Sequence, residues 1–356
     1  MNGLNIVVLG AGLMGRLVAW SLSRLGHRVQ LHETKASDQH GAAAWVAAAM
    51  LAPLAESAIT ELNVVQMGRY SLQRWPEMLA ELEHPVFFQQ DGTLVVWHRQ
   101  DASEAQRFSA KLMDTAQRMP ELNAPVALNA ASLHQLEPTL SDVFQQGLFL
   151  PGEGQLDNRQ LLNALMQQLQ SSHVELHFSS NVSPEQFSHA DWVIDCRGMG
   201  AHKAWDNLRG VRGEVLRIHA PDVKLSRPVR LIHPRYPLYI APKQDGVFVI
   251  GATEIESDDT SPASVRSSLE LLSAAYSVHK GFAEARILEI NAQIRPTLPD
   301  NLPAIRIHEN KYMHINGLYR HGFLIAPAIL DAALDLMEGR SDLAHSLGIS
   351  VLEEAP

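Results

Sequence analysis

The sequence predicts an α/β fold in which a discontinuous domain, built on a parallel sheet, is interleaved with a second domain built on an antiparallel sheet. Three patterns in the sequence lead to this prediction. The chain starts with a strand, a glycine-rich turn, a helix and a second strand; residues 212–252 have the pattern of antiparallel strands; and a strand, a loop and a helix begin at residue 312. We expect the first domain to comprise residues 1–83, 152–207 and 296–356, and the second to comprise residues 84–151 and 208–295.

The length, composition and charge of the chain indicate a globular protein and exclude several other classes. The chain has 356 residues, of which 46% are hydrophobic and 19% charged, so it is long enough for one large or two ordinary globular domains. Its formal net charge of −10 argues against broad binding to nucleic acid or to an anionic membrane. With one cysteine, no 18-residue apolar stretch and no signal peptide, we expect a cytoplasmic protein without membrane insertion; homo-oligomerisation stays open.

The first element is a short apolar strand over residues 5–10, typical of a strand buried on both faces of a parallel sheet. A helix with apolar periodicity follows over residues 13–25 and ends near Gly26. Residues 27–33 form a second strand, which ends at Glu33. This order of elements is that of a Rossmann-like nucleotide-binding unit.

The turn itself has the spacing G-x-G-x-x-G at Gly10, Gly12 and Gly15. The first glycine permits the tight turn, the second lets the backbone approach a pyrophosphate, and the third allows close packing of helix on strand. Glu33 is placed to accept hydrogen bonds from an adenosine ribose. The helix after the turn would direct its first residues, Leu13 and Met14, at the phosphates of a ligand. The turn alone does not identify that ligand, which can be NAD, FAD or another phosphate compound, and it is also compatible with no ligand.

The central part of the chain alternates less regularly. Expected there are a helix over residues 62–82 interrupted at Pro76, a hairpin over residues 86–97 turning at Asp91-Gly92, a helix over residues 103–119, a helix capped by Asp157, and strands over residues 174–178 and 191–195.

The remaining elements complete both sheets. Expected are antiparallel strands over residues 212–219, 238–242 and 247–252, a helix over residues 269–278, a strand over residues 312–315, a loop over residues 316–322 and a helix over residues 325–337. One strand–helix–strand unit therefore precedes the hairpin, and the signals of a parallel sheet return much later. A nucleotide domain divided in this way favours a flavin over a nicotinamide cofactor.

Several segments together resemble the glycine oxidase (thiamine-biosynthesis) branch of the D-amino-acid oxidase family. They are VVLGAG at 7–12, AAAMLAP at 47–53, DNRQLL at 157–162, DCRG at 195–198, VRGE at 211–214, LYIAP at 238–242 and GLYRHGFLIAP at 317–327. The resemblance covers nearly the whole chain. It implies non-covalent FAD, oxidative deamination of small amino acids or N-methyl amino acids, dioxygen as acceptor with release of hydrogen peroxide, and a link to thiazole synthesis.

The resemblance also implies roles for individual residues. Arg295 would bind the substrate carboxylate through its planar fork, and the hydroxyl of Tyr239 would hold the same carboxylate. Arg320 would lie beside the flavin ring and favour negative charge on the reduced ring; an ion pair with a purely structural role is its alternative. The other expected cofactor contacts are Ala47, Ala48, Met50, Val182, Gly198, Gly317, Tyr319, His321, Gly322, Phe323 and Leu324.

Two positions depart from the family pattern, and they leave the preferred amino acid open. Pro237 stands where related glycine oxidases can carry a histidine, and Trp45 stands where a small residue is common. The scattered histidines do not form a metal motif, and Cys196 is expected to be a buried structural thiol. The remaining alternatives are a flavin dehydrogenase with another acceptor, an NAD-dependent dehydrogenase and a non-catalytic flavoprotein.

Overall fold

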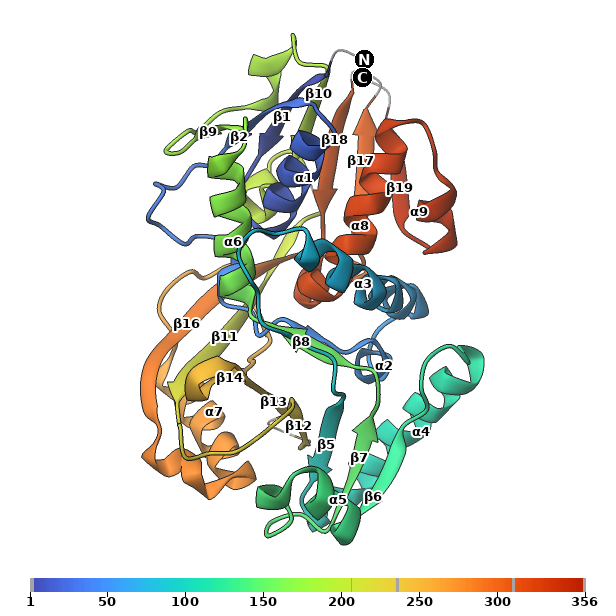
Figure 1. The fold of residues 1–356 in the computed structure, drawn as a ribbon, viewed down its shortest axis with the longest axis vertical. Coiled ribbons are helices and arrows are strands. Elements are labelled where there is room, and N and C mark those ends of the chain that lie inside the picture. Colours follow the sequence, from blue (N-terminus) through green and yellow to red (C-terminus); the bar gives the residue numbers. More distant parts are fainter. Residues whose placement is uncertain (1–2, 206, 235–236, 309–310, 355–356) are drawn as a thin grey trace.

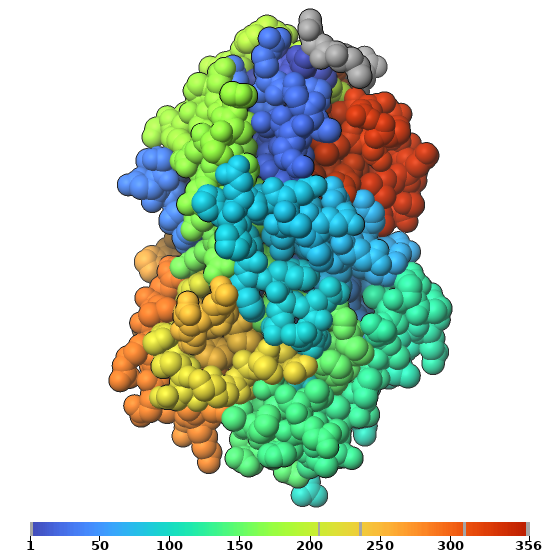
Figure 2. Space-filling view, viewed as in Figure 1, coloured from blue at the N-terminus to red at the C-terminus, as the bar shows by residue number. Residues whose placement is uncertain are grey.

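The computed structural model describes residues 3–205, 207–234, 237–308 and 311–354. Figure 1 shows two parts, each built on its own large sheet, with the two ends of the chain meeting in the upper part. In the space-filling view the blue and red ends of the chain share the upper half, and the yellow and orange segments lie in the lower half (Figure 2). The upper part is therefore built from segments that are far apart in the sequence, as the sequence pattern predicted.

Among the described residues, the upper sheet has seven strands in the order β19-β17-β18-β10-β1-β2-β9. Strand β17 runs antiparallel to β18 and parallel to β19. Its centre is fully buried because helices cover it, which suits the apolar run of β1. The strands are β1 (Asn5–Leu9), β2 (Arg28–His32), β9 (Glu175–His177), β10 (Trp192–Asp195), β17 (Ala304–His308), β18 (Tyr312–Asn316) and β19 (Ser350–Glu354).

Four long helices pack around this sheet and form its core. Apolar positions at helical spacing on α1 pack against α6 and α8, and α3 packs along α8. Asp157 accepts hydrogen bonds from the backbone N–H groups of Arg159 and Gln160 and so caps α6, as its sequence predicted. The helices are α1 (Leu13–Arg24), α3 (Leu62–Ala80), α6 (Asn158–Ser171) and α8 (Gly322–Met337), with the short α9 (Asp342–Ser346) before β19.

The lower sheet is mostly antiparallel, with the order β15-β11-β14-β13-β12-β5-β7-β6 and with β16 paired to β11. The helix α7 (Val265–Val278) packs on β11, β13 and β14, and α4 (Ala102–Arg118) and α5 (Ala130–Leu136) lie at the other end (Figure 1). The strands are β5 (Thr93–Trp97), β6 (Val126–Asn129), β7 (Gln146–Leu150), β11 (Arg209–His219), β12 (Val229–Ile232), β13 (Leu238–Pro242), β14 (Val247–Gly251), β15 (Ile255–Glu256) and β16 (Arg286–Thr297).

A small third sheet lies between the two large ones, with β8 (Gly154–Leu156) paired to both β3 (Met50–Leu51) and β4 (Phe88–Gln89). The short helix α2 (Pro53–Glu56) follows β3 directly. The predicted hairpin over residues 86–97 is wrong because β4 belongs to this small sheet and β5 to the lower one. Gly92, with φ of 82°, turns the chain between them, and its N–H donates to the carbonyl of Glu153.

Three helices differ from the prediction. The helix α7 begins at Val265 instead of residue 269, and the other two cases involve proline and glycine. The helix α3 continues through Pro76 because its buried face, which includes Leu72 and Trp75, is held against α8. The last long helix begins at Gly322 instead of near Ile325, after a 3-10 turn over Tyr319–His321. Tertiary packing decides both cases over the local signals that proline and glycine give. Among the described residues, none of the helices combines the length and the apolar character needed to cross a lipid bilayer.

Lys243 joins the lower sheet to the small one. It is 7% exposed, and its ammonium group donates to the carbonyl oxygens of Ala48 (2.9 Å) and Leu156 (2.7 Å) and to Oε1 of Gln155 (2.9 Å). The three N–H groups of the ammonium thus meet three buried acceptors.

We predict that Lys243→Met lowers the free energy of unfolding by about 1–3 kcal/mol, because it leaves buried acceptors without a donor. Lys111→Met is the matched control, since the exposed Lys111 donates to the carbonyl of Ala58 alone. Urea unfolding of both variants measures the difference, and equal stability losses would contradict the assigned role of Lys243.

Candidate active site

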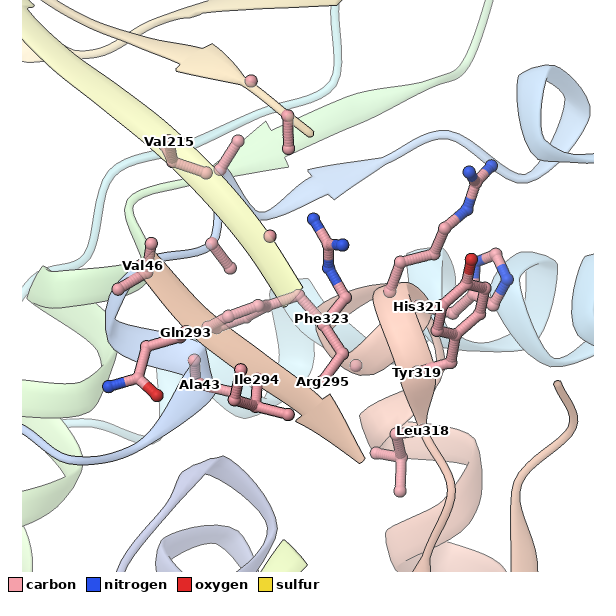
Figure 3. Close-up of a pocket in the computed structure, with 18 of the residues that line it drawn as sticks. Ala43, Val46, Val215, Gln293, Ile294, Arg295, Leu318, Tyr319, His321 and Phe323 are labelled. Atoms are coloured by element: carbon pink, nitrogen blue, oxygen red, sulfur yellow. The ribbon is translucent and has the colours of Figure 1, made fainter. Parts of the chain in front are cut away.

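A cavity of about 1070 Å³ lies where the two large sheets approach each other. It extends from the glycine-rich turn after β1 to the faces of β11, β13 and β16 in the lower sheet. Figure 3 shows one part of it, where Val46, Val215 and Ile294 form an apolar wall and Arg295, Tyr319 and His321 supply polar groups. The cavity is large enough for an elongated ligand that reaches both sheets.

The three glycines of the turn differ in what surrounds them. A Cβ on Gly15 would lie 1.8 Å from the carbonyl oxygen of Gly10, and Gly10 itself has φ of 92°. A Cβ on Gly12 would meet nothing closer than the Cβ of Ala42 at 3.7 Å. The first and third glycines are therefore required by the fold, whereas Gly12 leaves an open face on the cavity at the start of α1, where a phosphate can approach the backbone.

Glu33 stands at the end of β2, next to this turn. Its Oε2 accepts a hydrogen bond from the N–H of Ala11 (2.8 Å), and its Oε1 accepts from the N–H of Lys35 (3.0 Å). These bonds fix the carboxylate on the rim of the cavity, beside the face that Gly12 leaves open.

The start of α8 forms another side of the cavity. Gly322, Phe323 and Leu324 all line it, so the positive end of the helix dipole points into this space. The indole Nε1 of Trp75, on α3, donates to the carbonyl of Phe323 (2.9 Å) and fixes this helix start. A ligand that carries negative charge here is stabilised by a preformed group of backbone N–H donors.

Arg295 on β16 and Tyr239 on β13 face the same space, although β11 and β14 lie between these two strands in the sheet. The guanidinium of Arg295 lies over Gly213 of β11, since a Cβ at Gly213 would be 2.2 Å from its Nη2, and its Nη1 donates to the carbonyl of Thr253 (3.2 Å). The Tyr239 hydroxyl lies against Gly251 in the same way, and burial raises the pKa of this hydroxyl. Glycine at both positions makes room for a large polar side chain on the next strand.

A buried carboxylate organises the arginines of this region. Glu56, 9% exposed at the end of α2, accepts from Nη2 of Arg230 (2.7 Å) and from Nη2 of Arg320 (2.6 Å). Although burial opposes ionisation, the two guanidinium groups hold the pKa of Glu56 well below its usual range. Burial lowers the pKa of the adjacent His321 to about 4, so this imidazole is neutral at pH 7.

Glu254 completes the charge pattern at the edge of the cavity. Its Oε2 accepts from Nη1 of Arg320 (3.1 Å), and its Oε1 accepts from the hydroxyl of Tyr319 (2.6 Å). Arg230 and Arg320 are thus balanced by two carboxylates. In the part of the chain that the structure describes, Arg295 has no carboxylate within ion-pair distance, which leaves it free to bind an anionic ligand.

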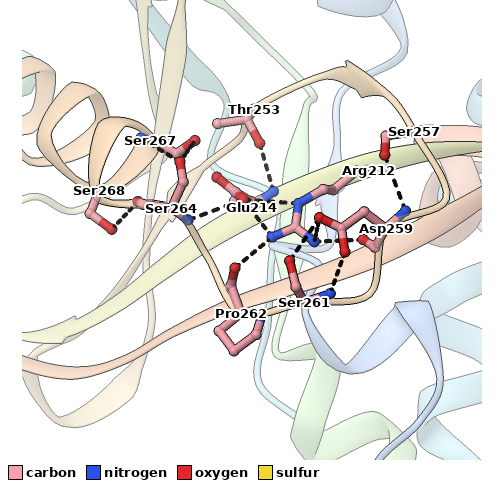
Figure 4. Close-up of polar contacts among 10 residues, drawn as sticks. All are labelled: Arg212, Glu214, Thr253, Ser257, Asp259, Ser261, Pro262, Ser264, Ser267 and Ser268. Carbon is pink, nitrogen blue, oxygen red and sulfur yellow. Dashed lines mark hydrogen bonds and ion pairs between the residues drawn. The ribbon is translucent and has the colours of Figure 1, made fainter.

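The loop that carries Thr253 and Glu254 is held by a buried ion pair (Figure 4). Arg212 donates to Oε1 of Glu214 through Nε (2.9 Å) and Nη2 (2.7 Å), and it also donates to the carbonyls of Asp259 (2.5 Å) and Pro262 (2.9 Å). The N–H of Glu214 donates to the hydroxyl of Thr253 (2.8 Å). The wall of the cavity beside Arg295 therefore has a fixed shape before any ligand binds.

Most of the residues proposed from the sequence meet in this cavity. Those that line it are Gly10, Gly12, Leu13, Met14, Glu33, Ala47, Ala48, Met50, Gly198, Tyr239, Arg295, Tyr319, Arg320, His321, Gly322, Phe323 and Leu324. Gly15, Val182 and Gly317 are not part of the lining. Gly15 lies under the turn, Val182 packs beside Val7, Leu9 and Val193, and Gly317 turns the chain with φ of 75°.

Sequence reasoning missed Glu56, Arg230 and Glu254, which also line the cavity. For Glu56 a signal was present, because a single carboxylate stands in a short helix of otherwise apolar residues, Pro53–Glu56. Arg230 lies in a short, mostly apolar strand, and Glu254 follows a strand in a polar segment; the partners of both lie far away in the sequence. Cys196 is buried and borders the cavity, and burial raises the pKa of its thiol.

We predict that Glu56→Gln lowers the free energy of unfolding at pH 7 by about 3–5 kcal/mol, because Arg230 loses the carboxylate that it binds and Arg320 loses one of its two. The folded-state pKa of Glu56 lies below its usual value of 4.5, so its contribution is complete above that pH and is lost as the pH falls. The difference between the two proteins should therefore shrink below pH 4.5 in urea unfolding. Glu77→Gln, which breaks an exposed pair with Arg74, should change stability by less than about 1 kcal/mol.

Comparison with known proteins gives a consistent result. Residues 5–334 match the model of the DAO family, described as FAD dependent oxidoreductase. The chain is 41% identical over 326 residues to the thiamine biosynthesis oxidoreductase ThiO of Rhizobium etli, covering 92% of this chain and 94% of that protein.

Solved structures share the fold. The iminodiacetate oxidase of Chelativorans sp. BNC1 superimposes with a TM-score of 0.82 at 20% identity, covering 98% of this chain and 100% of that one. The glycine oxidase of Geobacillus kaustophilus gives a TM-score of 0.81 at 21% identity, covering 97% of this chain and 98% of that one. With the family match and the identity to ThiO, the chain belongs to the FAD-dependent oxidoreductase (DAO) family and is an enzyme of the glycine oxidase/ThiO type.

Proposed function

We propose that this enzyme oxidises a small amino acid, such as glycine, to the imino acid, which hydrolyses to the oxo acid and ammonia, with dioxygen as acceptor and hydrogen peroxide as product. The observation that carries the proposal is Arg295, a cavity-lining guanidinium without a carboxylate partner among the described residues, beside the hydroxyl of Tyr239. The names of ThiO and of the glycine oxidase relatives support the same substrate class.

The cavity fits an FAD molecule at the points where such a cofactor needs space and donors. Gly12 leaves the start of α1 open for a pyrophosphate, Glu33 is fixed where an adenosine ribose would bind, and Ala47 and Ala48 keep the wall thin where the flavin would lie. The start of α8 offers N–H donors for negative charge on the flavin ring. We propose Gly198, Met50 and the segment 319–324 as further contacts, residues 1–83, 152–207 and 296–356 as the domain that binds FAD, and residues 84–151 and 208–295 as the substrate domain.

The chain's own residues bind and orient the substrate. The fork of Arg295 would hold both carboxylate oxygens, and Tyr239 would donate its hydroxyl to one of them, which fixes the direction of the Cα–H bond. FAD, when bound, supplies the acceptor for the hydride from Cα. The apolar wall of Val46, Val215 and Ile294 excludes water from the bound substrate and so strengthens the contact with Arg295.

Arg320 would act beside the flavin mainly as part of a balanced cluster. Its guanidinium binds both Glu56 and Glu254, so its charge is largely compensated in the free protein. We propose that Arg320 fixes the geometry of the site and makes a polar contact with the flavin, and that it does not act there as an isolated positive charge. A single cysteine in 356 residues supports a reducing compartment, and we place the reaction in the cytoplasm.

We predict that Gly12→Val folds normally but is purified without flavin. The open space around Gly12 accommodates a side chain within the protein, so the added methyl groups would displace the pyrophosphate and not the fold. Flavin absorbance after purification, and thermal unfolding of both proteins after removal of flavin, measure the two effects. Full flavin occupancy in the folded variant would remove the turn from the cofactor site.

We predict that Arg295→Ala weakens the binding of glycolate, a carboxylate ligand, by roughly 2–5 kcal/mol, because a desolvated charge-assisted contact is lost. Arg295→Lys should lie between this variant and the wild type, and Tyr239→Phe should cost about 1–2 kcal/mol. Arg266→Ala, which removes an exposed arginine at another part of the cavity lining, is the control.

These affinities are measured by following the flavin spectrum during titration, and every variant should remain yellow. Peroxide release with glycine under air then tests the reaction itself. Unchanged glycolate affinity in Arg295→Ala would overturn the assignment of the carboxylate site. Flavin reduction by glycine without peroxide would show a dehydrogenase in place of an oxidase.

A further inference from the structure

Glu254 and Glu56 both bind Arg320, but they differ in their exposure and in the number of cations that they bind. The side chain of Glu56 is 11% exposed, and its two oxygens receive the guanidinium groups of Arg230 and Arg320. The side chain of Glu254 is 50% exposed, and it lines the cavity. Each oxygen of the buried Glu56 thus already binds a cation, whereas the exposed Glu254 has one oxygen that binds none.

The open capacity lies on one oxygen in particular. Oε2 of Glu254 is bound to the charged Arg320, but Oε1 receives one hydrogen bond, from the neutral hydroxyl of Tyr319. A carboxylate oxygen accepts two hydrogen bonds, so Oε1 can accept another from a cation. The contacts with Tyr319 and Arg320 also hold the carboxylate in place, which lowers the entropy lost when a ligand binds.

Glu254 follows directly in the chain the residue that contacts Arg295. The carbonyl of the preceding residue, Thr253, accepts a hydrogen bond from the guanidinium of Arg295. Glu254 and the proposed carboxylate site are therefore neighbours in the same wall. An α-amino acid carries its carboxylate and its amino group on the same carbon, Cα, and therefore needs a cation and an anion close together in the site.

Other glutamates of the lining are not placed for this role. Glu33 stands at the glycine-rich turn, where its carboxylate is bonded to Ala11 and Lys35. Glu270 belongs to α7, beyond the loop that carries Glu254.

We propose that Glu254 receives the ammonium group of the substrate and thereby makes the site selective for amino acids over hydroxy acids of the same shape. The proposal rests on the proposed function, because it takes the carboxylate of the substrate to be bound at Arg295. Oε1 accepts an N–H of the ammonium group in a charge-assisted hydrogen bond, while Arg295 binds the carboxylate. A hydroxyl in place of the ammonium loses that charge-assisted bond.

A pair of ligands of equal shape tests this assignment with the holoenzyme. α-Aminoisobutyrate and 2-hydroxyisobutyrate differ in carrying an ammonium group or a hydroxyl, and neither has a Cα–H bond, so neither is oxidised. Titration of each into wild type, Glu254→Gln and the control Glu270→Gln is followed by the flavin spectrum. The wild type and Glu270→Gln should bind the amino compound more tightly than the hydroxy compound.

In Glu254→Gln the affinity for α-aminoisobutyrate should fall about 10- to 100-fold, the effect of losing one charge-assisted hydrogen bond, and that for 2-hydroxyisobutyrate should stay nearly constant. Glu254→Asp should recover part of the preference. An equal fall for both ligands would overturn the ammonium site and leave Glu254 as a support for Arg320. Failure of the wild type to bind either ligand would overturn the proposed function, and the ammonium site with it.

Discussion

The burial of charge at Glu56 is the constraint on which the candidate site depends. A carboxylate removed from water must be matched by cations, and here the matching cations come from two different parts of the fold: Arg230 from the lower sheet and Arg320 from the turn before α8. The three residues therefore join α2, β12 and α8 at one point. Each of these elements also lines the cavity, so the same contacts that neutralise the charge set the distance between the two sheets.

The polar surface of the cavity is divided between groups that are fully engaged and groups that remain available. Glu56, Arg230 and Arg320 bind one another, and the ion pair of Arg212 and Glu214 fixes the loop after β14 from outside the cavity. Arg295 and Glu254 retain open positions. An enzyme that must bind a dipolar substrate in a partly apolar space gains from this division, because the open groups are oriented by neighbours that do not move.

Local signals in the sequence predicted the local structure well. The spacing of Gly10, Gly12 and Gly15 defines a turn whose parts lie within a few residues, and Asp157 acts on the two N–H groups that follow it. Features that depend on distant partners could not be predicted from local sequence. Pairing with β7 and β8 decides the path of residues 86–97. The role of Glu56 depends on two arginines that lie 174 and 264 positions away in the sequence. Arg295 and Tyr239 were found through family resemblance, since the context of Arg295 alone describes a surface arginine near a proline and that of Tyr239 an ordinary strand residue.

The strand order of the upper sheet has a consequence for how the enzyme is made. β1 lies next to β10, β10 next to β18, and β19 follows β17 at the far edge, so β1 shares its sheet with strands that are translated much later. On the ribosome, the glycine-rich turn is exposed early but has no α8 opposite it until residue 322 has emerged. Pairing over such separations is slow. The complete cavity can therefore form only after α8 has been made, because the start of this helix supplies one of its sides.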